Sequence, residues 1–424
     1  MKAMEPMPSA AAAQHTSLDR KLVSAVKGIR LLGSVSWPAS VQARFLAGWR
    51  RGEARLPAIE YARADHSAAR EVIDGVHAAA DPGHPVGEYL RRSADSWRSA
   101  TELLDAVGTS ALTTHSVRLF GRPGHKVPGS DLSNLDAARH FITLASELDR
   151  EVLSSAADYC IPAETLRDDL QVQLDAFFGT GVVRVDIDAT LIAKAAAGAH
   201  RIRLRSATCF TEYDRNQLLE HEAYVHSLTA LNGRQQPNLG SLGLNSPRIT
   251  ATQEGLAVFA ELMTGSLDIE RIKRISLRIL AIDMALNGAD FIEVFRFFLD
   301  AGQTENDSFA SAQRVYRGSP LTGGAAFTKD TVYLHGLLSV HTFFRWALKN
   351  QRLNLCRNLF AGKMSLHDVV TLEGEFASGY IAAPRWLPRW VQHANGLATM
   401  LAFSLFANRI RLDHIEAEDL VLSL

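Results

Sequence analysis

Two histidines and a glutamate within residues 218–233 have the spacing of side chains that bind and use a metal ion. In the stretch LLEHEAYVHSLTALNG, Glu222 directly follows His221, and His226 lies five positions after His221. Imidazole nitrogens are common zinc ligands, and a carboxylate beside them can act as general base toward a metal-activated water. The pattern HExxxH therefore indicates metal-dependent hydrolysis as the first chemistry to test against the rest of the chain.

The spacing of the two histidines makes a demand on the helix that carries them. The stretch has a helical pattern of apolar residues and ends at Asn232-Gly233, a good C-cap. Histidines five positions apart lie about 140° from each other on an ideal α-helix. A π-bulge, one extra residue in the turn, brings the second histidine back beside the first. Two interpretations stay open: a metal site on a widened helix, or an ordinary helix with exposed or capping histidines.

Glu254 offers a third ligand. It lies in TATQEGLAVFAELM, where Leu256, Phe259, Leu262 and Met263 predict a second helix. Together with His221 and His226, Glu254 completes a His₂Glu set, the ligand type of zinc hydrolases that leave a fourth position for water. The alternative is an exposed glutamate in a first helical turn, where the helix dipole favours it.

The residues around Glu254 give two further predictions. Thr250 and Gln253 fit a capping box, with Gln253 reaching back to the helix start, so Glu254 is not needed as the cap. Gly255 is unfavourable inside a helix by up to about 1 kcal/mol, which predicts that two backbones approach each other closely there.

Candidate substrate-binding residues lie further along the chain. Arg314, Arg317 and Lys329 flank the glycine-rich segment GSPLTGGAAFTKD, and cations of this kind could hold a peptide's terminal carboxylate; the alternative is solvated loop charge. Tyr333 could donate to a developing oxyanion, although most tyrosines simply pack.

The remaining candidates have mostly structural interpretations. Asp214 and Glu261 are possible partners of the ligand histidines, although solvation at the surface is the default interpretation of both. His335, His341 and His367 are interpreted as structural. The sequence contains no GxSxG elbow, Walker P-loop or GxGxxG fingerprint, which argues against a serine hydrolase, a P-loop NTPase and a typical Rossmann enzyme.

The elements that must position these residues fall into three regions after a tail expected to be disordered. Short strands are predicted at 117–124, 182–188 and 202–206, the last as the sheet edge on which an extended peptide docks. An alanine-rich helix is predicted at 190–199, and the apolar run 396–407 is predicted as a buried helix too short to span a membrane. The segments are the tail 1–15, an N-terminal helical lobe 16–115, a catalytic core 116–265 and a mainly helical lobe 266–424 packed with the core.

Composition excludes several classes of protein. The 424 residues are 47% hydrophobic and 21% charged with a formal net charge of -1, which is typical of a globular protein and gives no reason to expect nucleic-acid or membrane binding. The three cysteines Cys160, Cys209 and Cys356 show no CxxC spacing. They predict neither a disulfide framework nor a zinc ribbon, and they fit a reducing, cytoplasmic compartment.

Three stretches carry a resemblance to a known family. IRLRSATCFTEYDRNQLLEHEAYVHSLTALNG, TATQEGLAVFAE and GGAAFTKDTVYLHGLL resemble the flavohemoglobin expression-modulating QEGLA-motif proteins, and residues 253–257 are the motif itself. That family includes the animal microtubule-associated tyrosine carboxypeptidases, zinc enzymes that remove a C-terminal tyrosine from tubulin. The resemblance implies His221, His226 and Glu254 as zinc ligands and Glu222 as the catalytic base.

The resemblance covers roughly residues 30–420, and it transfers metal chemistry more safely than substrate. The chain has no obvious microtubule-binding extension, so tubulin is not the expected substrate. The YLHG segment also places His335 where an acidic residue is expected in many relatives.

The sequence therefore predicts an α+β, mostly α-helical, zincin-like metallopeptidase with a small sheet beside the HExxxH helix. Its expected cofactor is Zn²⁺, its expected substrate is a peptide or protein C-terminus, and a tyrosine- or aromatic-selective carboxypeptidase is the favoured form. The alternative is a regulatory protein whose zinc site binds a peptide or is structural, without turnover. Glu222 favours the enzyme, because a purely structural site has no need of a base.

Overall fold

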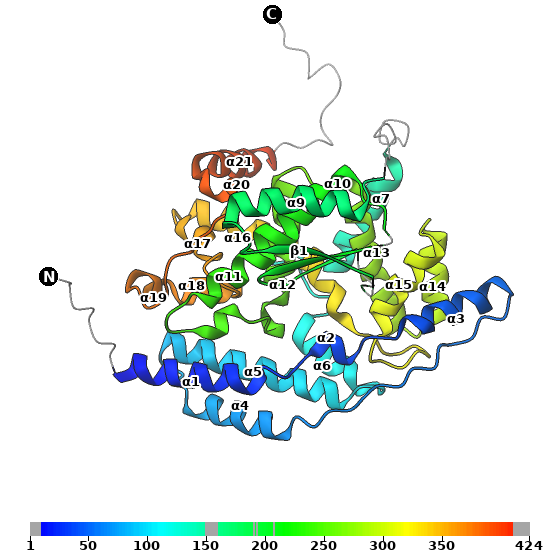
Figure 1. The fold of residues 1–424 in the computed structure, drawn as a ribbon, viewed down its shortest axis with the longest axis horizontal. Helices are drawn as coiled ribbons and strands as arrows, with labels where there is room; N and C mark the ends of the chain where they lie inside the picture. Colours follow the sequence, from blue (N-terminus) through cyan, green and yellow to red (C-terminus); the bar gives the residue numbers. More distant parts are fainter. Residues whose placement is uncertain (1–9, 149–159, 190, 192–193, 207, 410–424) are drawn as a thin grey trace, which may run out of the picture.

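A computed structural model describes residues 10–148, 160–189, 191, 194–206 and 208–409. Most of these residues are helical, and one small sheet of three strands lies among the helices (Figure 1). The predicted class, α+β and mostly α-helical, is confirmed for the described chain, whereas the zincin-like relationship stays a prediction. Among the described residues, no helix combines the length and the apolar character that crossing a bilayer requires.

The helices before the sheet are α1 (Ala10–Val26), α2 (Leu31–Ser34), α3 (Ala39–Arg50), α4 (Ser67–Ala79), α5 (Pro85–Asp105), α6 (Ala111–Phe120), α7 (Asn134–Glu147) and α9 (Ala163–Phe178). Those after it are α10 (Glu212–Gln217), the π-helix η1 (Leu218–Ser227), α11 (Leu228–Arg234), α12 (Thr250–Met263), α13 (Ile269–Leu286), α14 (Phe291–Asp300), α15 (Glu305–Tyr316), α16 (Val332–Lys349), α17 (Asn354–Asn358), α18 (Leu366–Thr371), α19 (Glu373–Ala377), α20 (Arg389–Gln392) and α21 (Ala394–Ala407). Short 3₁₀ turns are η2 (Gly240–Gly243), η3 (Pro247–Ile249) and η4 (Thr328–Thr331).

Helices α1, α4 and α5 pack side by side at one end of the molecule (Figure 1). Helix α5 begins at Pro85, whose fixed φ suits the first helical position, and the His84 side chain accepts a hydrogen bond from the Val86 amide. Helix α1 begins at Ala10, so residues 10–15, which the sequence assigned to the tail, are helical. Residues 1–9 lie outside the described part of the chain. The predicted division into three regions otherwise stays a prediction.

The sheet has the order β1-β3-β2. Strand β1 (Arg184–Asp188) runs parallel to β3 (Arg201–Arg205), with Arg184 opposite Arg201, and β2 (Ala195–Ala197) runs antiparallel to β3. Ile202 and Leu204 of β3 are buried while the residues between them are not, which is the alternation of a strand with one face on the core. The strands predicted at 182–188 and 202–206 are therefore confirmed.

Two predictions about the sheet were wrong. Strand β3 is central and has a neighbour on each side, so it offers no edge for a peptide. Ala195–Ala197, predicted as part of an alanine-rich helix, form β2, because the ladder to β3 outweighs the helix propensity of alanine. Residues 190, 192 and 193 of that predicted helix lie outside the described residues.

Two predictions outside the sheet also need correction. The segment 117–124 was predicted as a short strand leading into a turn, but its first part, up to Phe120, is instead the end of α6, where Leu112, Ser116 and Phe120 are buried at helical spacing. The helix predicted at 396–407 exists as α21, but it is not buried throughout, because Phe403 is 72% exposed and Phe406 is 63% exposed. A nearly continuous apolar run does not reveal which of its faces is covered.

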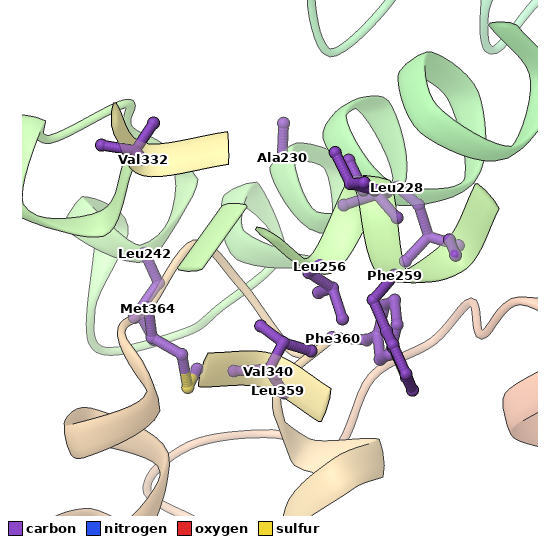
Figure 2. Packing of buried hydrophobic residues seen from close by; sticks show 14 of the residues in the cluster. Leu228, Ala230, Leu242, Leu256, Phe259, Val332, Val340, Leu359, Phe360 and Met364 are labelled. Atoms are coloured by element: carbon purple, nitrogen blue, oxygen red, sulfur yellow. The ribbon is translucent and has the colours of Figure 1, made fainter. Parts of the chain in front are cut away.

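The hydrophobic core consists of two clusters among the described residues. The larger one extends from α1 to α21 and includes Leu228, Leu256, Phe259 and Val340, which Figure 2 shows gathered between α11, α12 and α16. The smaller one is aromatic and is formed mainly by α3, α13, α14 and α15. The larger cluster packs directly behind the helices that carry His221 and Glu254, so it fixes their relative positions.

Helices α12 and α16 meet at a pair of glycines. A Cβ atom on Gly255 would lie 2.5 Å from the Cα of Gly336 and closer still to its carbonyl group. Ordinary contacts between carbon atoms are about 3.5–4.0 Å, so only glycine fits. The predicted close approach of two backbones at Gly255 is confirmed, and its partner is the glycine of the YLHG segment.

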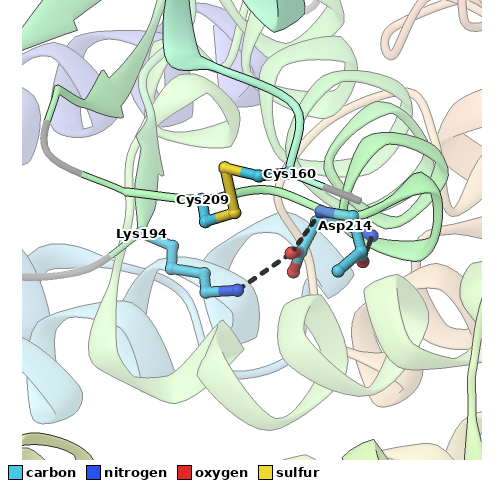
Figure 3. The surroundings of a disulfide bond; sticks show 5 residues. Cys160, Lys194, Cys209 and Asp214 are labelled. Atoms are coloured by element: carbon cyan, nitrogen blue, oxygen red, sulfur yellow. Dashed lines mark hydrogen bonds and ion pairs between the residues drawn. A yellow bond between two sulfur atoms is a disulfide. The ribbon is translucent and has the colours of Figure 1, made fainter. Parts of the chain in front are cut away.

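Cys160 and Cys209 form a disulfide (Figure 3). They are 49 residues apart in sequence, and the neighbouring residues Ile161 and Phe210 exchange two backbone hydrogen bonds of 2.8 and 3.1 Å. The expectation of unpaired cysteines was wrong for this pair, because the contact between the two segments has no local signal. Cys356 is free and buried. The reducing, cytoplasmic compartment stays a prediction.

Candidate metal centre

The two histidines lie on a π-helix. Residues Leu218–Ser227 form η1 between α10 and α11, so the turn is wider than in an α-helix. The rings of His221 and His226 are consequently neighbours, with centroids 4.8 Å apart. The widened turn that the five-residue spacing demanded is present.

Glu254 of α12 meets both histidines. Its Oε2 lies 3.6 Å from the Nε2 of His221 and 3.6 Å from the Nε2 of His226. These distances exceed normal hydrogen bonds but resemble the edge of a tetrahedron with zinc bonds of 2.0–2.1 Å, about 3.4 Å. Among the described residues, His221, His226 and Glu254 are the only group of histidine, cysteine or acidic side chains with donor atoms close enough to share a metal ion. The donor set therefore fits a zinc ion.

Gln253 holds α12 against the helix that carries the histidines. Its Oε1 accepts a hydrogen bond from Thr229 of α11 at 2.9 Å. The predicted capping box was wrong, because the Thr250 hydroxyl donates to the carbonyl of Pro247 and Gln253 is used for this tertiary contact. A capping residue and an interhelical residue have the same sequence signature here, and burial decides between them.

Glu261 and Arg271 hold His221 from behind. The Nδ1 of His221 lies 2.6 Å from a carboxylate oxygen of Glu261, which is fully buried and is held in turn by Arg271 at 2.7 Å. Burial would raise the pKa of Glu261, but Arg271 and His221 outweigh burial and lower it. A carboxylate on Nδ1 fixes the ring and leaves Nε2 for a metal. Glu261, which the sequence offered only as a possible partner, does contact one of the two histidines, and its role beside a metal ligand stays a prediction.

The charge around His221 and Glu254 suits a cation. Burial would lower the pKa of His221, but Glu254 and Glu261 raise it to about 10. Burial would raise the pKa of Glu254, but Lys329 and both histidines hold it well below its usual value. Both shifts show that positive charge is stabilised between these side chains, the place where a metal ion would replace a proton.

The other candidate partners lie elsewhere. Asp214, a possible partner of a histidine by sequence, instead caps α10 through Thr211 and pairs with Lys194 at 2.8 Å (Figure 3). The possible role beside a histidine was wrong. His335 lies in α16. Burial lowers its pKa, and the nearby His125 lowers it further.

His341 and His367 likewise belong to no metal-binding group among the described residues. The ring of His341 lies 5.9 Å from that of Phe259, and His367 is exposed on α18.

A polar network leads from Glu254 to the glycine-rich segment. The Nζ of Lys329 donates to Oε1 of Glu254 at 2.9 Å and lies 3.4 Å from the hydroxyl of Tyr333. Arg314 donates to the same hydroxyl at 3.3 Å and to Asp330 at 2.8 Å. The predicted substrate-binding residues and Tyr333 are thus brought together beside Glu254, one of the predicted metal ligands. Lys329 and Arg314 already have carboxylate partners within this network.

Two more arginines surround Asp330. The Nε of Arg278 lies 3.7 Å and an Nη of Arg317 lies 4.0 Å from its carboxylate, which is 1% exposed. Burial would raise the pKa of Asp330, but Arg314 and Arg278 lower it far below the usual range. The group Arg278, Arg314, Arg317 and Lys329, called the cationic cluster below, carries more positive charge than Asp330 and Glu254 neutralise.

Glu222 faces different surroundings from the three ligands. It is half-buried on η1 and forms no hydrogen bond or ion pair with other described side chains. Lys363 lies nearby: burial lowers its pKa to about 8, and Glu254 and Glu222 partly offset that effect. Lys363 is 5% exposed, and its Nζ lies 3.4 Å from Oε1 of Gln253.

Comparison with known proteins identifies the family of the chain. Residues 43–409 match the family described as microtubule-associated tyrosine carboxypeptidase. The chain belongs to this family. The family is one of carboxypeptidases, which agrees with the resemblance drawn from the motifs. No curated protein matches the chain at a significant level.

Sequence reasoning missed two buried cations of this carboxypeptidase-family chain. Arg278 interrupts the run ISLRILAI and Lys363 interrupts LFAGKMS, so each is a single charge within an apolar stretch. Charged side chains are rarely buried unless they are paired or functional, so this was the available signal. The ion pair between Arg271 and Glu261 had no comparable signature.

Proposed function

We propose that this member of the family is a zinc-dependent carboxypeptidase that removes a C-terminal tyrosine or another aromatic residue. The observation that carries the proposal is the equal 3.6 Å approach of both histidine Nε2 atoms to one oxygen of Glu254. The family description supports tyrosine as the residue removed. The cationic cluster, one contact beyond Glu254 through Lys329, supports recognition of a free carboxylate.

A zinc ion held by His221, His226 and Glu254 would supply Lewis-acid activation of a water molecule and of the scissile carbonyl. Glu222 is the general base in this proposal: it accepts the proton of the attacking water and passes it to the leaving amine. The absence of a hydrogen bond or ion pair from Glu222 to any other described side chain supports the role, because a carboxylate locked in an ion pair would be a poorer base.

Tyr333 is the proposed donor to the carbonyl oxygen as negative charge develops there. Lys329 and Arg314 both lie within hydrogen-bonding distance of its oxygen as donors, which leaves the tyrosine's own proton available. The two cations also hold the phenol in place, so Tyr333 would not need to reorganise during the reaction.

The proposed docking strand for the peptide is β2. It is the outer strand on the side of η1, and the hydroxyl of Ser227 on η1 donates to the carbonyl of Gly198, just after β2, at 2.7 Å. A peptide paired with the free edge of Ala195–Ala197 would be anchored by main-chain hydrogen bonds beside the histidines.

The test compares hydrolysis of a peptide ending in free tyrosine with hydrolysis of the same peptide ending in an amide. Zinc-loaded protein should release one tyrosine from the free acid and spare the amide, as judged by mass spectrometry. Glu222→Gln should keep zinc but lose hydrolysis by about 10²–10⁴-fold or more, because it removes the base and not a ligand.

Metal analysis of the protein with both His221→Ala and His226→Ala should show no bound zinc. Full zinc occupancy in that double variant, or unchanged hydrolysis by Glu222→Gln, would contradict the proposed site. Peptide and zinc binding without any cleavage would instead favour a regulatory protein.

A further inference from the structure

The cationic cluster contains two kinds of cation. Arg314 makes two hydrogen bonds to Asp330 and one to Tyr333. Lys329 donates to Glu254 and lies beside Tyr333. The donors of these two side chains are therefore largely occupied by carboxylate and phenol oxygens of the protein itself. Neither is well placed to exchange its partner for a substrate without disturbing a metal ligand or a buried aspartate.

Arg278 and Arg317 differ from them in their partners. Their contacts to Asp330, 3.7 and 4.0 Å, are too long for hydrogen bonds. The Nε of each is buried and has no hydrogen-bond partner among the described residues. The side chains are 24% and 15% exposed, so their remaining nitrogens are within reach of solvent. Guanidinium groups without acceptors in a largely buried site are expected to bind an anion that the protein does not supply.

The two arginines come from different elements and converge on one point. Arg278 belongs to α13 and Arg317 directly follows α15, yet both lie against the single carboxylate of Asp330. The guanidinium of Arg317 lies 5.0 Å from the centre of the Phe327 ring, which holds the side chain through a cation–π contact. A contact with the ring provides no hydrogen-bond acceptor oxygen, so it does not replace a carboxylate as the partner of this guanidinium.

Charge and position both favour a carboxylate as the ligand. Burial, and then repulsion from Arg314, lowers the pKa of Arg278 and of Arg317 to about 10. An incoming anion would offset that repulsion. The C-terminal carboxylate of a peptide lies close to the scissile bond, about one residue of about 3.5 Å beyond it. The two arginines belong to the network that reaches Glu254: they lie against Asp330, Asp330 is bonded to Arg314, Arg314 donates to Tyr333, and Lys329 lies between Tyr333 and Glu254.

We propose that Arg278 and Arg317, and not Arg314 or Lys329, bind the α-carboxylate of the substrate's C-terminal residue. This inference rests on the carboxypeptidase function proposed above and identifies its specificity-determining residues. Arg314 and Lys329 are positioning residues: Arg314 orients Asp330 and Tyr333, and Lys329 orients Glu254.

The test measures binding and not turnover. Zinc-loaded Glu222→Gln protein is titrated with N-acetyl-Ala-Ala-Tyr as the free acid and as the C-terminal amide, and the ratio of the two affinities is recorded. The free acid should bind about 10- to 100-fold more tightly, the range of charge-assisted hydrogen bonds. Arg278→Met and Arg317→Met should each bring the ratio close to one while leaving amide affinity nearly unchanged. Arg278→Lys should give an intermediate ratio, because charge is kept and the planar fork is lost.

The matched control is Arg274→Met, which removes an exposed arginine one turn earlier on α13 and should leave the ratio unchanged. A ratio that stays high in both the Arg278 and Arg317 variants, or no acid preference at all, overturns the assignment. If a methionine variant loses amide binding as well, Arg278→Lys and Arg317→Lys decide. Each keeps the charge and loses the planar fork, so an intermediate ratio still separates binding of a carboxylate from a packing role.

The binding test also separates this inference from the proposed function. If the wild-type protein releases tyrosine but the affinity ratio does not depend on Arg278 and Arg317, the carboxypeptidase function stands and the proposed subsite is refuted. A ratio that depends on both arginines in a protein that cleaves nothing establishes the subsite and refutes the enzyme.

Discussion

Replacing Gly255 by alanine should destabilise the protein, although alanine is the better helix former. The added Cβ would lie 2.5 Å from the Cα of Gly336 and still closer to its carbonyl group. Restoring ordinary contact distances of at least about 3.5 Å requires α12 and α16 to separate by about 1 Å. These helices carry Glu254 and Tyr333, so the displacement would reach the candidate site directly.

The magnitude follows from two opposing contributions. Overpacking of a close interface costs about 1–3 kcal/mol, and a gap of 0.5–1 Å elsewhere along it forfeits about a quarter to a half of the local dispersion energy. Replacing glycine by alanine inside a helix contributes up to about 1 kcal/mol in the other direction. The clash is with backbone, which has no rotamer to change, so the net loss of unfolding free energy should be about 2–3 kcal/mol.

Urea denaturation measures this loss, and Gly75→Ala provides the matched control. Gly75 also lies inside a helix, α4, but a Cβ there would have no atom within 4 Å. The control should stabilise the protein by about 0.5–1 kcal/mol. Zinc affinity should fall in the Gly255 variant and stay constant in the Gly75 variant. A Gly255→Ala protein as stable as the wild type would refute the close approach of α12 and α16.

Two further predictions concern buried carboxylates. Glu261→Gln should weaken zinc binding by about 10–100-fold in a competition assay, because the neutral amide no longer fixes the His221 ring. The control Glu270→Gln changes an exposed residue nearby and should have no effect. Equal zinc affinities of the wild type and Glu261→Gln would show that Glu261 does not support the site. Burial raises the pKa of Asp19 from 3.8 to about 6, so the folded state binds the proton more tightly than the unfolded state does. The contribution of this group to the free energy of unfolding, up to about 3 kcal/mol, should therefore be lost as the pH rises from about 4 to 6. Asp19→Asn should abolish that part of the pH dependence in denaturation curves at pH 4.5 and 7.5; an unchanged pH slope would show that Asp19 titrates normally.

The features that the sequence predicted well are those with local causes. A five-residue histidine spacing can share a helix face only if the turn widens, and η1 is such a turn. A glycine in the middle of an apolar helix is unfavourable unless something occupies the space of its side chain, and Gly336 does so for Gly255. In both cases the physical constraint acts within a few residues, so it is visible in the chain itself.

The features that the sequence missed depend on contacts between distant segments. Ala195–Ala197 have helical propensity but gain more from the ladder to β3. Gln253 has the position of a capping residue, yet it bonds to Thr229 because α12 packs against α11. The disulfide between Cys160 and Cys209 follows from the pairing of two segments that no periodicity connects. Each outcome required knowledge of the partner.

The cationic cluster shows the same limit where it matters most for function. Three of its members were found as cations flanking a glycine-rich segment, but sequence position could not separate those neutralised by the protein from those left for a ligand. Asp330 pairs closely with Arg314, and Glu254 pairs closely with Lys329. Arg317, and Arg278 from another helix, have only longer contacts to Asp330. Because a largely buried guanidinium without a hydrogen-bond acceptor is unfavourable, the pair that we propose binds substrate is defined by the arginines that the fold leaves without hydrogen bonds among the described residues, and not by the density of positive charge along the chain.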